Sequence, residues 1–244
     1  MHVDDLWDLA LRGILATVVE GQGRFGGRLV ELPGASGVVG SAIPIPCWVH
    51  DPTVELRSVI DALRAAGEPG PVHIVAEHPE QDLLVAEGWE LEERVTEMVL
   101  LARPEPATYP LSIDLVQVPD GLDEFYAAMA RGFEVSGNEP ETWLPRPATA
   151  VDGVRLFLAR DEDGQVIGTA GMRRRGPGAG LFAISVPPAL RKRGLGEALT
   201  RHASAVAFDL GAELVQLQAS PDGYSIYERV GFRPVGRWAF YHRT

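Results

Sequence analysis

The sequence predicts an α+β fold in which two successive halves each form a mixed, mostly antiparallel central sheet flanked by helices. Three observations lead to this prediction. Residues 181–210 read as an apolar strand, a basic glycine-containing turn and an amphipathic helix. Residues 154–186 contain three strand-like runs separated by turn residues. When the chain is shifted by 143 positions, the elements of its first half fall on those of its second half without a gap.

The first half opens with an amphipathic segment over residues 1–20. Its apolar positions recur at helical spacing: Leu6, Leu9, Ala10, Ile14 and Val18. The next residues, from Gly21 to Gly26, match the letters G-x-G-x-x-G of a dinucleotide-binding turn. They follow a helix and lead into a strand at 28–32, which is the reverse of the order that such a site needs. We therefore expect a flexible turn there.

The repeat rests on four matches between the halves. Ile43-Pro44 aligns with Val186-Pro187, the helical segment 54–66 with the helix after Gly196, the strand 71–76 with 214–219, and Gly88-Trp89 with Gly231-Phe232. Identity between the halves is low, so a chance match is the alternative. The agreement of order, element length and terminal Gly-aromatic pair favours a true repeat.

The same alignment shows which chemistry the first half lacks. The basic turn Arg191-x-x-Gly194-x-Gly196 is matched by residues 48–53, which hold no glycine and no cation cluster. Asp51 would repel a phosphate, and Pro52 has no N–H group to donate. We expect residues 1–105 to form a degenerate domain that supports the second half structurally, with Cys47 as a buried hydrophobe.

A Pro-rich linker over residues 104–110 precedes the second half. The elements expected after it are a strand at 111–118, a helix at 122–133, a polar loop with a short helix at 134–143, strands at 154–160, 166–175 and 181–186, a helix at 197–210, a strand at 213–219, a short helix and a closing strand from Phe232. Turns at 161–164 and 176–180 separate the central strands, which predicts an antiparallel meander.

The turn inside residues 181–210 has the composition of a phosphate site. The first turn of a helix presents free backbone N–H groups and the positive end of the helix dipole. Gly194 and Gly196 let the backbone approach a phosphate, and three consecutive basic residues, 191–193, add charge. The spacing is not that of a P-loop, and a dinucleotide fingerprint would need a third glycine where Leu199 stands.

The pattern Arg191-x-x-Gly194-x-Gly196 after a strand resembles the acyl-CoA pyrophosphate loop of the GNAT superfamily of N-acetyltransferases. A strand to Ala219, a short helix ending in Tyr227-x-x-x-Gly231-Phe232 and a final strand follow, as in the last third of a GNAT domain. The resemblance implies a GNAT-type fold for residues 106–244 and a degenerate GNAT-like copy over 1–105. It also implies an enzyme that transfers an acetyl group from acetyl-CoA to a primary amine of a small molecule or peptide.

The resemblance further implies roles for particular residues. The cofactor-binding residues would be Ile184, Ser185, Val186, Arg191, Lys192, Arg193, Gly194, Leu195, Gly196, Glu197 and Ser220. The strand edge at 184–186 would pair with the pantetheine arm, because the two prolines after it end normal strand pairing. The backbone N–H of Val186 would stabilise the oxyanion, and Tyr227 would be the general acid that protonates the leaving thiolate. Helix capping is the alternative role for Ser220, and simple packing is the alternative for Tyr227.

The general base is the least defined role, because the strand before the turn carries no acidic residue. Glu134, Glu139 and Glu141 lie in the loop that usually borders the acceptor site in GNAT enzymes, and Glu139 is the candidate. A solvated loop acid is the alternative for each of them. His202 is expected to pack or to lie on its helix surface. Two roles are open for the arginines at 173–175. They would face the CoA 3′-phosphate or an acidic acceptor, or they would form an exposed strand end.

Composition limits the remaining possibilities. The 244-residue chain has a net charge of −12, which argues against a nucleic-acid surface. A single cysteine excludes an intrachain disulfide and a cysteine-rich zinc site, and we expect no metal. Without a signal-peptide pattern or a bilayer-spanning stretch, we expect a cytoplasmic monomer or homodimer without a membrane partner. A non-catalytic acyl-CoA-binding or sensor protein and a structural interaction module are the alternative functions.

Overall fold

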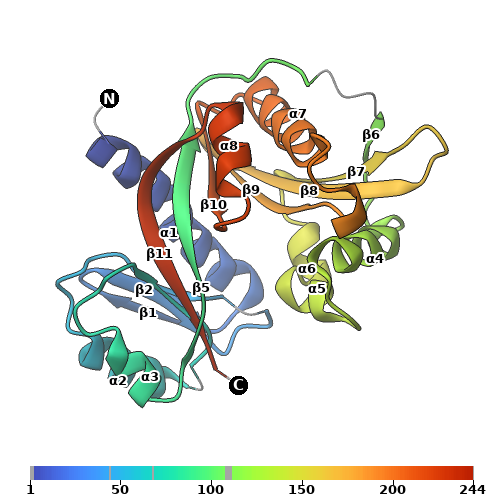
Figure 1. The fold of residues 1–244 in the computed structure, drawn as a ribbon. Coiled ribbons are helices and arrows are strands. Elements are labelled where there is room, and N and C mark those ends of the chain that lie inside the picture. The colour runs from blue at the N-terminus through green and yellow to red at the C-terminus, as the bar shows by residue number, and fades with distance from the viewer. Residues whose placement is uncertain (1–2, 44, 68, 108–111, 244) are drawn as a thin grey trace. The chain divides into compact units, whose positions relative to one another are not determined.

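The computed structural model of the chain describes residues 3–43, 45–67, 69–107 and 112–243. The chain divides into two units: unit 1 comprises residues 1–97, 218–222 and 234–244, and unit 2 comprises residues 98–217 and 223–233. The C-terminal residues thus belong to unit 1, where the red strand β11 (Arg233–His242) lies beside the green strand β5 (Glu90–Leu100) in Figure 1. This division differs from the contiguous domains, 1–105 and 106–244, expected from the sequence.

Unit 1 contains helices α1 (Val3–Phe25), α2 (Leu56–Ala66) and α3 (Asp82–Ala86). Its strands follow the spatial order β1 (Arg28–Leu32), β2 (Ala35–Val39), β3 (Cys47–Val49), β4 (Val72–Val75), β11 (Arg233–His242) and β5 (Glu90–Leu100). Strands β1 to β3 are antiparallel neighbours, as are β4 and β11, whereas β3 and β4 are parallel. The apolar face of α2 is buried in the core with Ile74 and Trp89, as its helical periodicity predicted.

Helix α1 is longer than expected. The sequence predicted a turn at Gly21 to Gly26, but the helix continues through Phe25, and the chain turns at Gly26 and Gly27 with positive φ. A Cβ at Gly21 would lie 2.6 Å from Ile45 Cδ1, so this glycine lets the helix backbone lie against that side chain. The predicted position of the turn was wrong because the first glycine serves close packing.

Unit 2 contains the elements expected for the second half. Its strands follow the spatial order β10 (Leu214–Ala219), β9 (Gly178–Ser185), β8 (Val166–Arg175), β7 (Val154–Arg160) and β6 (Ser112–Leu115). Its helices are α4 (Leu122–Phe133), α5 (Glu139–Trp143), α6 (Arg146–Thr149), the 3-10 turn Pro188–Leu190, α7 (Leu195–Asp209) and α8 (Tyr224–Val230). Strands β6 to β9 form an antiparallel meander, and β9 and β10 are parallel. The meander and the strand–helix–strand–helix order are confirmed.

Some boundaries differ from the prediction. Strand β9 begins three residues earlier than expected, because Gly178, Ala179 and Gly180 pair with β8. Strand β6 is shorter than residues 111–118, and Leu111 and residues 108–110 of the expected linker lie outside the described residues. None of the described helices combines the length and the apolar character needed to cross a bilayer.

The elements of the two units repeat in the same order. A shift of 143 positions places the end of α2 on the end of α7, and Gly88 on Gly231, both with positive φ after a short helix. In each unit a helix joins two parallel strands, β3 to β4 and β9 to β10. The ungapped alignment fails upstream of α2, however. Strand β3 ends at Val49, so the expected match of Ile43 with Val186 is wrong, and Pro44 lies outside the described residues.

Candidate functional site

The parallel strands β9 and β10 separate partway along their length. Their register pairs Leu214 with Gly178, Val215 with Ala179, and Gln216 with Gly180, and no further pair is found among the described residues. Strand β9 nevertheless continues to Ser185, so residues 181–185 have no partner on β10. Such an edge leaves N–H and C=O groups that a peptide-like ligand can bind by strand addition. The edge predicted at 184–186 lies at the end of this opening.

A β-bulge lies in the same open part of β9. The β8–β9 register shifts between the Gly171–Phe182 pair and the Thr169–Ser185 pair, so one residue of β8 lies opposite two residues of β9. Ala183, within the bulge, has a φ of 51°, in the left-handed region that side-chain-bearing residues seldom adopt. No sequence signal marks this bulge, because Ala183 stands in an uninterrupted apolar run without a glycine.

The turn after β9 has the backbone geometry of an anion site. Lys192 and Gly194 have positive φ values of 61° and 87°, and Gly194 directly precedes α7. No side chain caps the start of this helix, so the first N–H groups, at residues 195–197, have no intrahelical acceptor. Lys192 and Arg193 are exposed and make no hydrogen bond or ion pair within the described part of the chain. The turn therefore offers backbone donors and two available cations.

Arg191 behaves differently from the other two basic residues. Its Nε donates to the Val186 carbonyl oxygen at 3.1 Å, and its Nη2 donates to the Gly132 carbonyl oxygen at 2.8 Å. The guanidinium also pairs with Glu134 at 3.1 Å. The side chain expected to contact a pyrophosphate thus joins the end of β9 to the C-terminus of α4.

Glu197 in the first turn of α7 is held by two arginines. Its carboxylate accepts hydrogen bonds from Arg201 Nε at 3.0 Å and from Arg229 Nε at 3.2 Å. Burial opposes ionisation of this carboxyl, but the two hydrogen bonds lower its pKa overall. Because Arg229 lies on α8, Glu197 ties the helix after the phosphate turn to the helix that carries Tyr227.

Tyr227 is partly buried on α8. Its ring packs edge-on against Phe232, with ring centroids 6.1 Å apart. Burial raises the pKa of the phenol to about 12, so it stays protonated at neutral pH. The backbone N–H groups of Gly231 and Phe232 donate to the Tyr227 carbonyl oxygen, and Gly231 has a φ of 111°. Gly231 therefore forms a left-handed glycine cap at this helix end.

The three loop acids considered as general base differ in their contacts. Glu134 pairs with Arg191 at 3.1 Å, and Glu141 pairs with Arg146 at 2.9 Å. Glu139 begins α5, is exposed, and forms no ion pair with the described residues. Its carboxylate is therefore the one of the three that is not already neutralised by an arginine.

Three further residues and one arginine cluster that the sequence singled out are placed as follows. Ser220 follows β10 and falls in unit 1. His202 packs edge-on against Phe157, with ring centroids 5.0 Å apart, and burial lowers the pKa of its imidazole. Cys47 is buried, which raises the pKa of its thiol to about 12 and confirms it as a core residue. The arginines at 173–175 are partly buried at the end of β8.

The corresponding helix start in unit 1 is occupied by a carboxylate of the chain itself. The N–H of Leu56, the first residue of α2, donates to Glu80 Oε2 at 2.7 Å. In the preceding loop, Asp51 Oδ1 accepts hydrogen bonds from Thr53 N at 2.8 Å and from Thr53 Oγ1 at 2.7 Å. Glu80 thus lies where a bound anion would lie at the start of α7.

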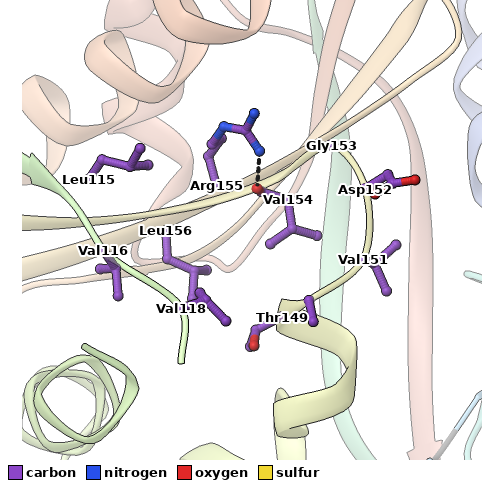
Figure 2. Close-up of a pocket in the computed structure, with 11 residues that line it drawn as sticks. Leu115, Val116, Val118, Thr149, Val151, Asp152, Gly153, Val154, Arg155 and Leu156 are labelled. Carbon is purple, nitrogen blue, oxygen red and sulfur yellow. Dashed lines mark hydrogen bonds between the residues drawn. The ribbon is translucent and has the colours of Figure 1, made fainter. Parts of the chain in front are cut away.

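A pocket of about 400 Å³ lies in unit 2 between the chain after β6 and the α6–β7 connection (Figure 2). Aliphatic side chains form much of its wall: Leu115, Val116, Val118, Val151, Val154 and Leu156. Figure 2 shows the Arg155 guanidinium folded back over its own strand, where Nη1 donates to the Val154 carbonyl oxygen at 2.7 Å. None of the residues predicted to bind acetyl-CoA lines this pocket.

Comparisons with known proteins identify the family. Residues 122–232 match the model of the acetyltransferase (GNAT) family. Mycothiol acetyltransferases from Clavibacter michiganensis subsp. michiganensis and Clavibacter sepedonicus are 28% and 27% identical to the chain over 215 residues. Each of these alignments covers 77% of this chain and 67% of the relative.

Solved structures share the fold over most of the chain. A GCN5-related N-acetyltransferase from Kribbella flavida superposes with a TM-score of 0.67 at 19% identity, covering 95% of this chain and 94% of that one. A second, from Sphaerobacter thermophilus, has a TM-score of 0.59 at 19% identity, covering 86% and 76%. The open β9–β10 edge and the uncapped start of α7 lie within the residues that match the family model. Residues 122–232 therefore belong to the GNAT family of acetyltransferases, enzymes that use acetyl-CoA.

Proposed function

We propose that this enzyme transfers the acetyl group of acetyl-CoA directly to a primary amine of a small molecule or peptide. The observation that carries the proposal is the opening between β9 and β10, which ends at the turn before the uncapped start of α7. An open strand edge suits the amide-rich pantetheine arm, and an uncapped helix start suits a pyrophosphate. One ligand that contains both groups in series is coenzyme A.

The proposed roles divide between backbone and side chains. Backbone N–H groups of residues 192–197 bind the pyrophosphate, and Lys192 and Arg193 add charge. Arg191 holds the turn in place through Val186 and Gly132. The edge at 184–186 pairs with pantetheine.

The proposed reaction is a single displacement through a tetrahedral intermediate. The acceptor nitrogen attacks the thioester carbonyl carbon, and the Val186 N–H stabilises the oxyanion. The carbon–sulfur bond then breaks, and Tyr227 donates its phenolic proton to the departing sulfur. Glu139, directly or through water, takes the proton that the acceptor nitrogen loses. The products are an amide and the free thiol of coenzyme A.

We propose that residues 1–105 have no second acetyl-CoA site and support the fold. Glu80 accepts the hydrogen bond of the Leu56 N–H at the start of α2, and the loop before α2 contains Asp51 and Pro52 in place of glycines. A negative charge already at the helix start would repel a pyrophosphate. One acetyl-CoA per chain is therefore the expected stoichiometry in calorimetry, and two would contradict this role.

Removal of the two available cations is expected to weaken acetyl-CoA binding. The double variant Lys192→Ala/Arg193→Ala should raise the Kd for acetyl-CoA by about 10- to 30-fold, because each exposed cation contributes about 1 kcal/mol to binding a phosphate. The wild-type Kd should also rise more steeply with salt than that of the variant. Calorimetry at two salt concentrations measures both effects.

The matched control is Arg24→Ala, which removes an exposed cation from the end of α1. Its Kd for acetyl-CoA should stay within about twofold of wild type. Equal effects of the control and the double variant would place the phosphate site elsewhere.

Turnover tests the activity itself. Release of coenzyme A thiol is followed with a panel of amines that includes the acceptor of the mycothiol acetyltransferases, because these are relatives of this chain. Acetyl-CoA-dependent acetylation of at least one amine is the expected result. Tight binding of acetyl-CoA with no turnover of any amine would instead support an acyl-CoA-binding protein.

A further inference from the structure

Two buried hydroxyl groups lie beside the bulge in β9. Thr169 Oγ1 is 2.7 Å from the Ala183 carbonyl oxygen and 2.8 Å from Ser185 Oγ. Thr169 and Ser185 are 0% and 4% exposed. A carbonyl oxygen can only accept, so the one hydroxyl hydrogen of Thr169 goes to Ala183. Ser185 must then donate its own hydrogen to Thr169 Oγ1, which makes a directed chain of two hydrogen bonds.

This chain satisfies a backbone group that the strand ladder leaves out. Ala183 has no register partner on β8, because the pairing passes from Phe182 to Ser185 across the bulge. The hydroxyl of Thr169 takes the place of a ladder N–H as donor to the Ala183 carbonyl. The left-handed backbone of an alanine is strained and persists where surrounding contacts hold it. The Thr169 hydroxyl is such a contact.

The hydroxyl pair also touches the element that Arg191 contacts. A Cβ at Gly132 would collide with Ser185 Oγ, so this glycine lets the backbone of α4 lie directly against the hydroxyl. The carbonyl oxygen of Gly132 accepts the hydrogen bond from Arg191 Nη2 at 2.8 Å. The phosphate turn, the end of α4 and the bulge are therefore linked by contiguous contacts within unit 2.

We infer that Thr169 is a positioning residue for acetyl transfer. Together with Ser185 it holds the bulge in β9, and the bulge orients the backbone N–H groups of the open β9 edge. The inference rests on the proposed function, in which one of these N–H groups binds the oxyanion. Thr169 is fully buried and acts through Ala183. Loss of its hydroxyl should therefore impair the chemical step more than the binding of acetyl-CoA.

The test compares three variants in steady-state kinetics and calorimetry. Thr169→Val keeps the side-chain shape but removes the hydroxyl, and kcat should fall about 10- to 100-fold with the Kd for acetyl-CoA within about threefold. Thr169→Ser restores the donor, and kcat should return to within about threefold of wild type. The control Thr149→Val deletes another buried hydroxyl, which donates to the Arg146 carbonyl oxygen at 2.7 Å, and should leave kcat unchanged.

A crystal structure of Thr169→Val supplies a readout that does not depend on activity. Ala183 should leave the left-handed region, and the β8–β9 register should change at this point. If Thr169→Val does not fold, Ser185→Ala, which removes the other donor of the chain, should lower kcat about 3- to 10-fold. A wild-type kcat in both variants, or an unchanged Ala183 conformation in Thr169→Val, would overturn the inference. Failure of wild type to turn over any amine would overturn the proposed function instead. In that case the Ala183 conformation in the Thr169→Val crystal structure would still show whether Thr169 holds the bulge.

Discussion

Tyr227→Phe is expected to lower kcat for acetyl transfer by about 100-fold or more while the Kd for acetyl-CoA changes by less than about threefold. The substitution removes the phenolic proton and keeps the ring that packs against Phe232. Because burial raises the pKa of this phenol to about 12, the proton is present across the whole working pH range. The loss should therefore be similar at pH 6 and pH 9. Thiol release and calorimetry measure the two quantities.

Tyr241→Phe is the matched control, since Tyr241 is a buried tyrosine on β11 in unit 1. It should keep kcat within about threefold of wild type. The wild-type pH–rate profile should also show no decline caused by Tyr227 below about pH 11, because the phenol titrates above that value. Full turnover by Tyr227→Phe would remove Tyr227 from the acid role.

Glu97→Gln is expected to stabilise unit 1 increasingly as the pH rises above about 4.5. Glu97 lies on β5 with no exposed surface, and its Oε2 accepts hydrogen bonds from Gln218 Nε2 at 2.6 Å and Trp238 Nε1 at 3.1 Å. Its Oε1 is buried with no hydrogen-bond partner among the described residues. Burial raises the pKa of this carboxyl to about 8, although the two hydrogen bonds oppose the shift. Glutamine has the shape of the neutral carboxyl and avoids the cost of ionising it.

The sign of the pH dependence follows from the two pKa values. The folded-state pKa of Glu97, about 8, lies above the value of about 4.3 in an unfolded chain. Between these values the folded state keeps a proton that the unfolded state has lost. This group therefore lowers the wild-type free energy of unfolding as the pH rises from about 4.5 to 8, by up to roughly 5 kcal/mol. The Glu97→Gln variant should lack this decline and match wild type near pH 4.5.

Urea unfolding followed by tryptophan fluorescence at pH 5, 6.5 and 8 measures the effect. Glu90→Gln, an exposed position at the start of the same strand, is the control and should keep the wild-type pH dependence. Parallel stability curves for wild type and Glu97→Gln would mean that the carboxyl is ionised at no cost, which contradicts its burial.

Local patterns predicted much of the fold. Helix α4 and strands β7 and β8 have the bounds expected from periodicity and turn residues, and α8 ends directly before Gly231, as the pattern Tyr227-x-x-x-Gly231 predicted. These signals are local because each depends on neighbours within a few residues. The repeat held from α2 onward but failed before it, where the connection from β3 to α2 is shorter than the one from β9 to α7.

Contacts between distant residues could not be predicted in the same way. The motif predicts that Arg191 contacts a phosphate, but no local pattern indicated that its guanidinium also donates to Gly132 and Glu134, more than fifty residues away in the sequence. Likewise, β11 pairs with β4 in unit 1, although it ends the half that contains α7. A strand at the end of the second half can pair with a strand of either half through the same backbone hydrogen bonds. No sequence pattern therefore indicates which partner it takes.

The sequence alone determined that this chain has a strand, a basic glycine turn and a helix in GNAT order, with a tyrosine in the following short helix. Those features are set by residue type and spacing along one stretch of backbone. Only the tertiary structure decided that β9 and β10 part at Gly180, that Ala183 bulges, and that Thr169 and Ser185 hold the bulge. Pairing, strain and buried hydrogen bonds arise between segments that packing brings together, so their partners cannot be read from either segment by itself.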